Sequence, residues 1–293
     1  MAILKSLIMR NSRKKIGGIV AYGLKGQTVG REQAAKVTNR RTTAQMSQRV
    51  RLANLVQLWK RMSFWAKKGA FQTKLQKESD YNAFVKANIK GNVAYLTKEQ
   101  AEAGCSVVAP VIVAKGSLNP IHTRYDGNSE LWITGLVVGD AQYSPTTLGK
   151  LAQDIIDNND GIQNGDQLSL IKILQYNGDT EPTCRVVAHE WTLDTSDTTA
   201  YAGSDVAKWL ETNTAGSETE SCLVNPIDIE KEGVAFVLSR VVNGQLQVSN
   251  AQIVLSTDAQ SIYDDYKNQA TLAAAIKSYG TNVEDFLIPG DQV

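Results

Sequence analysis

The chain has 293 residues, of which 42% are hydrophobic and 21% are charged, values typical of folded protein that argue against an intrinsically disordered chain. Its formal net charge of +1 conceals a strong asymmetry: residues 1–91 carry twenty Lys and Arg against three acids, and residues 92–293 carry eleven against twenty-seven. The two balances are therefore +17 and −16. No apolar run approaches the roughly 20 residues that cross a bilayer, which argues against a membrane-spanning protein.

The positive charge of residues 1–91 has little local compensation. No Asp or Glu occurs between Gln33 and Lys77, so this half of the chain cannot neutralise itself. Its counter-charge has to come from water and salt, from the acidic half, from a neighbouring copy or from nucleic acid. Contacts between a basic region of one copy and an acidic region of the next are heterologous, and they close into rings where the rotation permits.

Two features bear on the cellular compartment. The apolar N-terminus is interrupted by Lys5 and followed by Arg10 and Arg13, which reverses the charge order of a signal peptide. The three cysteines are far apart and include no C-x-x-C pair, so neither a zinc ribbon nor a disulfide framework is predicted. We expect a soluble, non-exported protein with free thiols in a reducing compartment.

Residues 1–41 are predicted to form an extended basic arm. Residues 16–26 mix β-forming residues with glycines, a combination that favours a twisted ribbon or hairpin over a helix. The polar stretch over 26–42 predicts irregular or extended chain. Arms of this kind usually gain order by lying on another surface.

Residues 42–91 are predicted to form a basic helical hairpin. Thr42 and Gln45 fit a capping box, in which the Thr42 hydroxyl accepts from a free backbone N–H and the Gln45 side chain bonds back. A second helix is predicted over 73–89, with Leu75 among its inward residues. One face of the first helix carries apolar residues at helical spacing: Leu52, Leu55, Val56, Trp59, Met62 and Trp65.

Residues 92–255 are predicted to form a β-rich, sandwich-like domain with short helices, followed by C-terminal helices and a tail over 256–293. The fold class is therefore α+β. Asn243-Gly244 is the strongest hairpin signal in the chain. Strands are expected at 106–114, 131–138, 167–176, 185–193, 235–242 and 246–255. Helices are expected at 146–158, at 204–211 with Trp209 buried, and within 257–279.

Residues that could perform chemistry are few. The chain has two histidines: His122 in a predicted loop, and His189 in a predicted strand, where a half-buried packing role is expected. No H-E-x-x-H, Walker or dinucleotide-binding motif is complete, and the acidic run over 157–161 fails the register of a calcium loop. We therefore predict no enzyme, no catalytic residue, no metal site and no cofactor.

The basic residues are the strongest candidates for a functional surface. Trp59, Phe64 and Trp65 accompany them and could stack on bases, although the spacing of the two tryptophans favours the seam between helices. Whether the charges contact DNA or an acidic protein stays open at this stage. The candidate assembly or nucleic-acid contacts are Arg13, Lys14, Lys15, Arg40, Arg41, Gln45, Gln48, Arg49, Arg51, Lys60, Arg61, Lys67 and Lys68.

The start of the first predicted helix resembles a known signature. Residues 39–49 read Asn-Arg-Arg-Thr-Thr-Ala-Gln-Met-Ser-Gln-Arg and resemble the N-P-R-T-x-x-Q-x-x-Q-R signature of an uncharacterised Bacteroidota protein family, with Arg40 in the place of proline. Similar stretches over 113–118 and 235–250 follow in the same order. The family has no established activity, so the resemblance implies no catalytic residue. By general likeness and host range, the chain also looks like a virion structural protein of crAss-like phages.

The signature has a physical interpretation. Gln45, Gln48, Arg49 and Leu52 recur every three to four residues, so they line one stripe of the helix. Two amides and a guanidinium in a row can bind extended backbone, such as the arm of the same or a neighbouring subunit. This arrangement would serve assembly.

The leading interpretation is a non-enzymatic structural subunit of a phage virion, in a ring or connector near the head–tail junction. It would reside in the virion and, during assembly, in the host cytoplasm. Its partners would be other copies of itself and portal, tail or capsid proteins, with DNA as a further candidate and no membrane. One alternative is an internal DNA-associated virion protein, and another is a capsid decoration protein that binds host glycans. Steeply salt-dependent DNA binding would mark the first alternative, and exposed aromatic residues on the body would mark the second.

Overall fold

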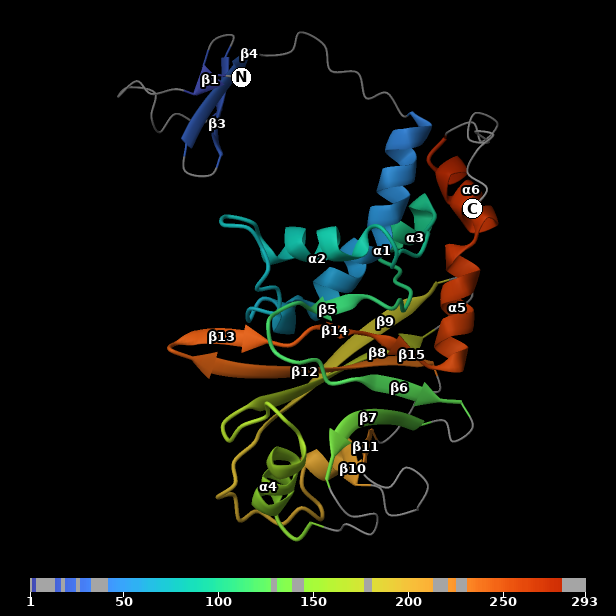
Figure 1. The fold of residues 1–293 in the computed structure, drawn as a ribbon. Helices are drawn as coiled ribbons and strands as arrows, with labels where there is room; N and C mark the ends of the chain where they lie inside the picture. Colours follow the sequence, from blue (N-terminus) through green and yellow to red (C-terminus); the bar gives the residue numbers. More distant parts are fainter. Residues whose placement is uncertain are drawn as a thin grey trace. The chain divides into compact units, whose positions relative to one another are not determined.

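The computed structural model describes residues 2–3, 14–16, 19–24, 27–32, 42–127, 131–138, 145–176, 181–212, 221–224 and 231–280 (Figure 1). The chain divides into two compact units, Met1–Arg41 and Thr42–Val293, which we call the arm and the body. The division falls where the first predicted helix begins.

The arm is a small antiparallel sheet. Its strands are β1 (Ala2–Ile3), β2 (Lys14–Ile16), β3 (Ile19–Leu24) and β4 (Gln27–Glu32), in the order β1-β4-β3-β2. The hairpin of β3 and β4 agrees with the ribbon or hairpin predicted for residues 16–26. Strand β4 continues into the stretch for which irregular or extended chain was predicted, because Thr28 and Val29 favour a strand and pair with β3, where Val29 lies opposite Tyr22.

One antiparallel sheet organises the body. Its strands are β8 (Gln167–Tyr176), β9 (Thr183–Thr192), β12 (Glu232–Val242) and β13 (Gln245–Val248), in the order β13-β12-β8-β9, and β15 (Val254–Leu255) also pairs with β12. Asn243 and Gly244 join β12 to β13 with φ angles of 51° and 75°. Positive φ at both positions is the type I′ hairpin geometry that the Asn-Gly sequence predicts.

A helical layer covers one face of this sheet (Figure 1). It contains α1 (Thr43–Ala66), α2 (Asp80–Asn88) and α5 (Thr257–Lys267), and α3 (Lys98–Ala103) and α6 (Gln269–Ser278) contact α1. Leu55, Leu58 and Met62 of α1 are fully buried in the same hydrophobic cluster as Ile171 of β8 and Val237 of β12. This cluster is the first core of the body.

A second sheet and α4 (Leu148–Asn158) cover the opposite face. The strands of this sheet are β10 (Leu210–Thr212), β11 (Ser221–Val224), β7 (Leu131–Val137) and β6 (Thr123–Asp126), in the order β10-β11-β7-β6. Alternate residues of β8 face the two cores: Ile171 lies in the first, and Leu168 and Leu170 lie in the second with Trp132. β8 is buried on both faces from Leu168 to Gln175, and this buried stretch includes the polar residues Ser169, Lys172 and Gln175.

Residues 105–111 pass through the first core, and amide side chains take the place of a neighbouring strand. Asn54 of α1 accepts from the Val107 N–H at 2.8 Å and donates to the Val107 carbonyl at 2.9 Å. Gln175 of β8 accepts from the Val108 N–H at 2.7 Å, and Asn88 of α2 holds Ile112 in the same two-bond manner as Asn54. The strand predicted over 106–114 is therefore confined to β5 (Ile112–Ala114), which pairs with β14 (Ala251–Gln252).

Two predictions about helix starts need correction. The second helix begins at Asp80, not at 73, because the Ser79 hydroxyl provides the N-cap; Leu75 precedes it and is 67% exposed, not inward. Thr42 does cap α1, since its hydroxyl accepts from the Gln45 N–H at 3.4 Å, but the described residues show no return bond from the Gln45 side chain. The complete capping box forms at Thr97, before α3.

The α+β fold class is confirmed, with a β-rich region that precedes the C-terminal helices. Residues 204–211 differ from the predicted helix, because they form the short 3-10 helix η1 (Val206–Lys208) and the start of β10; Trp209 is buried there, as predicted. The helices before residue 91 and after residue 255 share the first core with the sheet, so the body is one compact unit. The predicted tail over 281–293 lies outside the described residues. Among those described, no helix combines the length and apolarity needed to cross a membrane.

Candidate interaction surfaces

One histidine packs on a tryptophan, and the other lies at the start of the β6–β7 pairing. His189 is half-buried and stacks on Trp209, with ring centroids 6.0 Å apart and planes inclined by 22°. Burial lowers the pKa of His189, and the nearby Lys172 cation lowers it further. His122 is exposed, and its carbonyl accepts from the Gly135 N–H at 2.7 Å. In the part of the chain that the structure describes, no three His, Cys, Asp or Glu side chains gather in a way that could hold a metal ion.

The described thiols are buried. Burial raises the pKa of Cys184 to about 12, and it also raises the pKa of Cys105. Both are free and protonated at neutral pH, which makes them unreactive. The side chain of Cys222 lies outside the described residues.

An open groove of about 410 Å³ lies between residues 119–122 and the end of α4. Asn159 lines it, but its side-chain amide is already engaged with the backbone of Val137, through bonds of 2.7 and 3.0 Å. The side-chain amide of Asn159 therefore does not define a ligand site in this groove. The tryptophans of the β-rich region do not define a glycan site either, because Trp132, Trp191 and Trp209 are all buried.

The predicted contact residues of the arm are only partly described. Lys14 and Lys15 lie in β2, an edge strand of the arm sheet, and nothing is described of their side chains. Arg13, Arg40 and Arg41 lie outside the described residues.

Arg61, one of the predicted contact residues, is half-buried and bonded to backbone carbonyls of the body. Its Nε donates to the Cys184 carbonyl at 2.7 Å and its Nη2 to the Gly104 carbonyl at 3.1 Å, so it ties α1 to β9 and to the chain after α3. Arg51 is half-buried, and its Nε has no partner among the described residues. Lys68 forms an exposed ion pair with Glu190 at 2.8 Å, a contact of small energetic value.

Trp59 and Trp65 lie in the helix seam, as their spacing favoured. They are 9% and 6% exposed, and the Trp59 ring lies 5.5 Å from Phe84 and 5.9 Å from Tyr81 of α2. They are therefore not available to stack on bases.

The exposed signature residues and two further lysines lie along an outer stripe of α1 and its C-cap. Gln45, Gln48, Arg49, Lys60 and Lys67 are exposed. Leu52 and Val56, predicted to face inward, are half-buried and belong to no described hydrophobic cluster. We define the outer stripe of α1 as the row Gln45, Gln48, Arg49, Leu52, Val56, Lys60 and Lys67.

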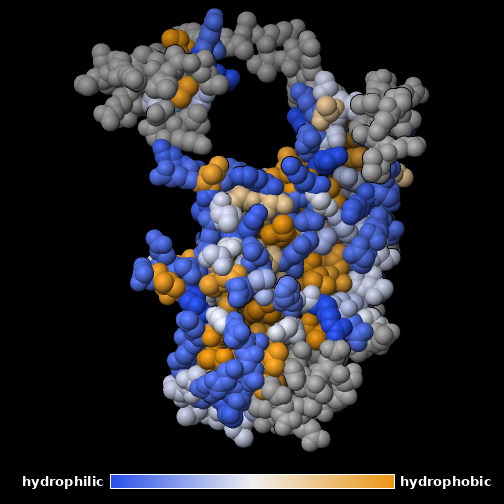
Figure 2. All heavy atoms as spheres, in the orientation of Figure 1, coloured by the Kyte–Doolittle hydropathy of each residue, from blue (hydrophilic) through white to orange (hydrophobic). Residues whose placement is uncertain are grey.

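Large apolar side chains near the helical layer are also exposed. Phe64 of α1 is 55% exposed, and Val241 of the β12–β13 hairpin is 68% exposed. Gln72 connects the loop after α1 to that hairpin, because it accepts from the Val248 N–H at 3.1 Å and donates to the Leu246 carbonyl. Sequence reasoning missed the exposure of Val241, which follows from the length of β12 beyond the helices that cover the sheet. Figure 2 shows one face of the molecule, with hydrophobic side chains visible among the hydrophilic ones.

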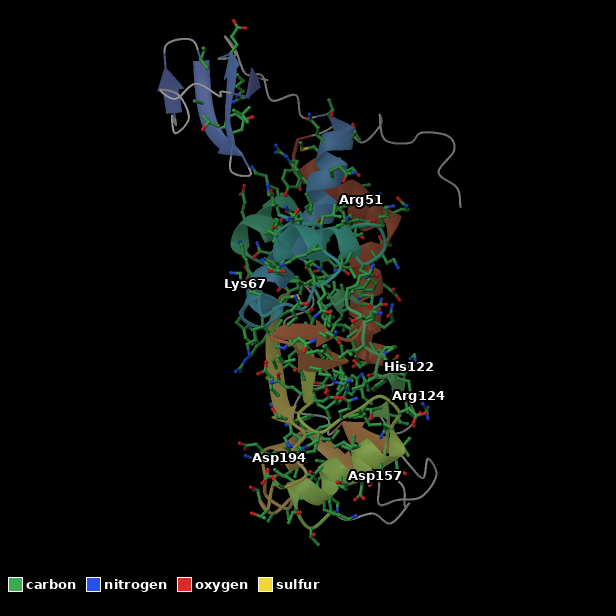
Figure 3. All side chains as sticks on the ribbon, turned by 60° about the vertical axis from the view of Figure 1, so that its left-hand side comes forward. Arg51, Lys67, His122, Arg124, Asp157 and Asp194 are labelled. Carbon is green, nitrogen blue, oxygen red and sulfur yellow. The ribbon has the colours of Figure 1, made fainter. Side chains whose placement is uncertain are left out.

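The body carries opposite charges at its two ends. Residues 42–91, the part of the helical layer that contains α1 and α2, have ten Lys and Arg against two acids, and we call this part the basic helical layer. Around α4, residues 145–166 and 193–212 each have one Lys against four acids. We call these two segments the α4 end. Figure 3 shows Arg51 and Lys67 toward the helical layer and Asp157 and Asp194 at the other end of the body.

Comparison with known proteins shows that part of the chain is similar to a family of unknown function. The chain matches the model of that family (DUF6266) over residues 11–124. The matched stretch includes strands of the arm, helices α1 to α3 and strand β5, and it stops before the central sheet. No curated protein and no solved structure matches the chain.

Proposed function

We propose that this chain is a non-enzymatic structural subunit that assembles head to tail, with the basic helical layer of one copy against the acidic α4 end of the next. The carrying observation is an excess of unpaired cations on the helical layer. Lys60, Lys67, Lys77, Lys86 and Lys90 are exposed and form no ion pair with any described residue. A surface of this kind raises the rate and specificity of association with an acidic partner.

The chain supplies an acidic surface of similar size. The formal charge of the basic helical layer is +8 and that of the α4 end is −6, or −5 without Asp166, which is buried and paired with Arg240. Contact between different surfaces of identical copies is heterologous, so it generates rings or filaments. The arm adds ten Lys and Arg against one acid, and its separate sheet can bind a neighbouring copy as a second attachment.

The setting that we propose is a ring or connector near the head–tail junction of a phage that infects Bacteroidota. Support for this setting comes from the resemblance over residues 39–49 and from the charge pattern, which favours a head-to-tail contact that closes into a ring where the rotation permits. Electron microscopy of purified protein at low salt tests it directly: closed rings of one size are expected, and open filaments or monomers alone contradict it.

The head-to-tail contact can be tested by exchanging charges. Native mass spectrometry is performed between about 50 and 500 mM salt, because exposed charges are screened over this range. Lys60→Glu with Lys67→Glu lowers the charge of residues 42–91 from +8 to +4 and should weaken the oligomers, and Asp157→Lys with Asp194→Lys, which changes the α4 end from −6 to −2, should do the same. A mixture of the two variants should restore mixed oligomers, because the reversed helical surface of one variant meets the reversed α4 end of the other, and the two unchanged surfaces also meet. Oligomers that ignore both reversals, or a strict monomer at low salt, contradict the proposal.

A second candidate function is DNA binding by the helical layer, and exposed Phe64 is the observation that favours it. An exposed ring among lysines can stack on an unpaired base, a contact worth about 1–3 kcal/mol. Fluorescence titration with DNA over a salt series would show a steep slope and a loss of single-strand affinity in Phe64→Ala. Affinity that does not vary with salt removes this candidate.

A further inference from the structure

The outer stripe of α1 has an apolar centre with a cation at each end. Leu52 and Val56 lie one helical turn apart and are half-buried, although neither packs into a described core. Arg49 and Lys60 flank them and are exposed. Two aliphatic side chains between two cations suit an extended segment with apolar residues in its middle and carboxylates at its ends.

The described chain ends beside the start of this stripe. Leu272 and Ile276 of α6 pack against Met46 and Val50 in the first turns of α1. Tyr279 is half-buried against the same cluster. Its hydroxyl is close enough to Arg49 for that cation to act on its pKa, although burial, the larger effect, raises the pKa.

Gly280 then turns the chain away from α6. Its φ is +77°, the left-handed conformation that commonly follows a helix, and its N–H bonds to the Lys277 carbonyl at 2.9 Å. Gly280, the last described residue, therefore follows the end of α6 that packs against the first turns of α1.

The sequence of segment 281–293 has the complementary pattern. It contains three carboxylates, Glu284, Asp285 and Asp291, and no Lys or Arg. Between them lies the apolar run Phe286-Leu-Ile288, and the following proline biases Ile288 toward extended backbone. In extended chain Phe286 and Ile288 project from the same side about 6.6 Å apart.

The spacings of the two partners agree. Leu52 and Val56 are separated by about 6 Å along the helix axis. The four residues from Gly280 to Glu284 span up to about 14 Å, which is enough to reach the stripe from the end of α6.

We propose that residues 284–291 dock in extended form along the outer stripe of α1 in the same molecule. Phe286 and Ile288 then cover Leu52 and Val56. Glu284 lies toward Arg49, and Asp291 lies toward Lys60. The segment occupies the stripe to which sequence analysis assigned the arm, so tail and arm compete for one surface. This docking occurs within one molecule and does not depend on assembly.

Hydrogen exchange of the full chain, followed by mass spectrometry at low protein concentration and low salt, tests the docking. The amides of residues 284–291 should exchange at least ~10-fold more slowly than in unstructured peptide. Leu52→Ser with Val56→Ser should remove this protection while the amides of β8 remain protected. Lys86→Ser, an exposed position on α2, is the matched control and should change nothing.

A second variant covers the case in which the serine substitutions disturb α1. Arg49→Glu with Lys60→Glu should reduce the protection several-fold, and adding Glu284→Lys with Asp291→Lys should restore it. The proposal is overturned if residues 284–291 exchange freely in the native chain or stay protected in both variants. Protection of residues 284–291 that rises with protein concentration would show that the tail docks on another copy, and protection lost on deletion of the arm would show that it docks on the arm. Both outcomes overturn docking of the tail on the stripe of its own molecule.

Discussion

The helical layer and the α4 end lie on opposite faces of one sheet, and they differ in how many of their charged side chains form ion pairs. At the α4 end the acids have neighbours that compensate them: Lys150 binds Asp154 at 2.8 Å, and Lys208 binds Asp205 at 2.6 Å. In the helical layer most exposed cations lack such neighbours among the described residues, Lys74 with Asp80 being an exception. The acidic surface is thus partly neutralised by its own chain, whereas the basic surface depends on salt or on a partner. The uncompensated charge that an acidic partner could neutralise therefore lies mainly on the helical layer.

The helical layer also differs between its inner and outer sides. On the inner side, polar groups of α1 are committed to backbone: Asn54 to Val107, and Arg61 to Cys184 and Gly104. On the outer side, the amides and cations of the stripe are exposed. Chemically similar substitutions on the two sides of α1 should therefore have different effects. Those on the inner side should lower stability, and those on the outer side should affect association.

The largest effect is expected for Asn54→Leu. The substitution leaves the buried N–H and carbonyl of Val107 without partners, so the free energy of unfolding should fall by about 2–4 kcal/mol. Urea denaturation measures it. Gln48→Leu, at an exposed amide of the same helix, is the control and should stay within about 0.5 kcal/mol. Equal losses in the two variants would show that the hydrogen bonds between Asn54 and Val107 do not contribute specifically to stability.

Arg61→Met should come next, with a loss of about 1–3 kcal/mol, because two carbonyls that accept from the guanidinium lose their donor. The adjacent Lys60→Met is its control: unfolding should change by less than about 0.5 kcal/mol, while salt-dependent self-association weakens. Denaturation and sedimentation of both variants measure the two properties. A reversed pattern would contradict the assignment of inner and outer sides.

Where local pattern decides, the fold could be predicted. Asn243-Gly244 predicts a hairpin because few other residues accept positive φ at two successive positions. The predicted bounds of β8, 167–176, agree with the structure because this segment is rich in Leu and Ile. The strand expected at 106–114 failed because the partner of that segment is a set of amides far away in sequence, Asn54 among them. No local pattern encodes such a partner.

The candidate surface could be predicted only where a local pattern determines which side chains are buried. Helical spacing placed Trp59 and Trp65 in the seam, and their packing confirms it. Nothing in the sequence distinguishes Arg61 from Lys60, yet the first is bound to interior carbonyls and the second is exposed. The difference depends on where β9 passes, which is a property of the tertiary structure.

A smaller effect is expected at the α4 end. Lys150→Met removes the compensation of Asp154, so the end becomes more acidic and head-to-tail association at low salt should strengthen about two- to threefold. The melting temperature should stay the same, because the pair is at the surface. Lys277→Met, which removes a cation from α6, is the control for net charge and should leave association unchanged. Weaker association of Lys150→Met would contradict the proposed polarity of the contact.

The smallest effect concerns His189, in the sheet between the two regions. Its pKa is lowered in the folded state by burial and by Lys172, so the unfolded chain binds the proton more readily. Stability should therefore be constant above the ordinary histidine pKa of about 6.5 and decline as the pH falls below it. Because the ring is only half-buried, the decline between about pH 7.5 and 5.5 should stay below about 1 kcal/mol. His189→Gln should abolish the decline in urea denaturation, and His122→Gln, at an exposed loop, should leave it in place. A decline that persists in His189→Gln would assign it to other groups of the body.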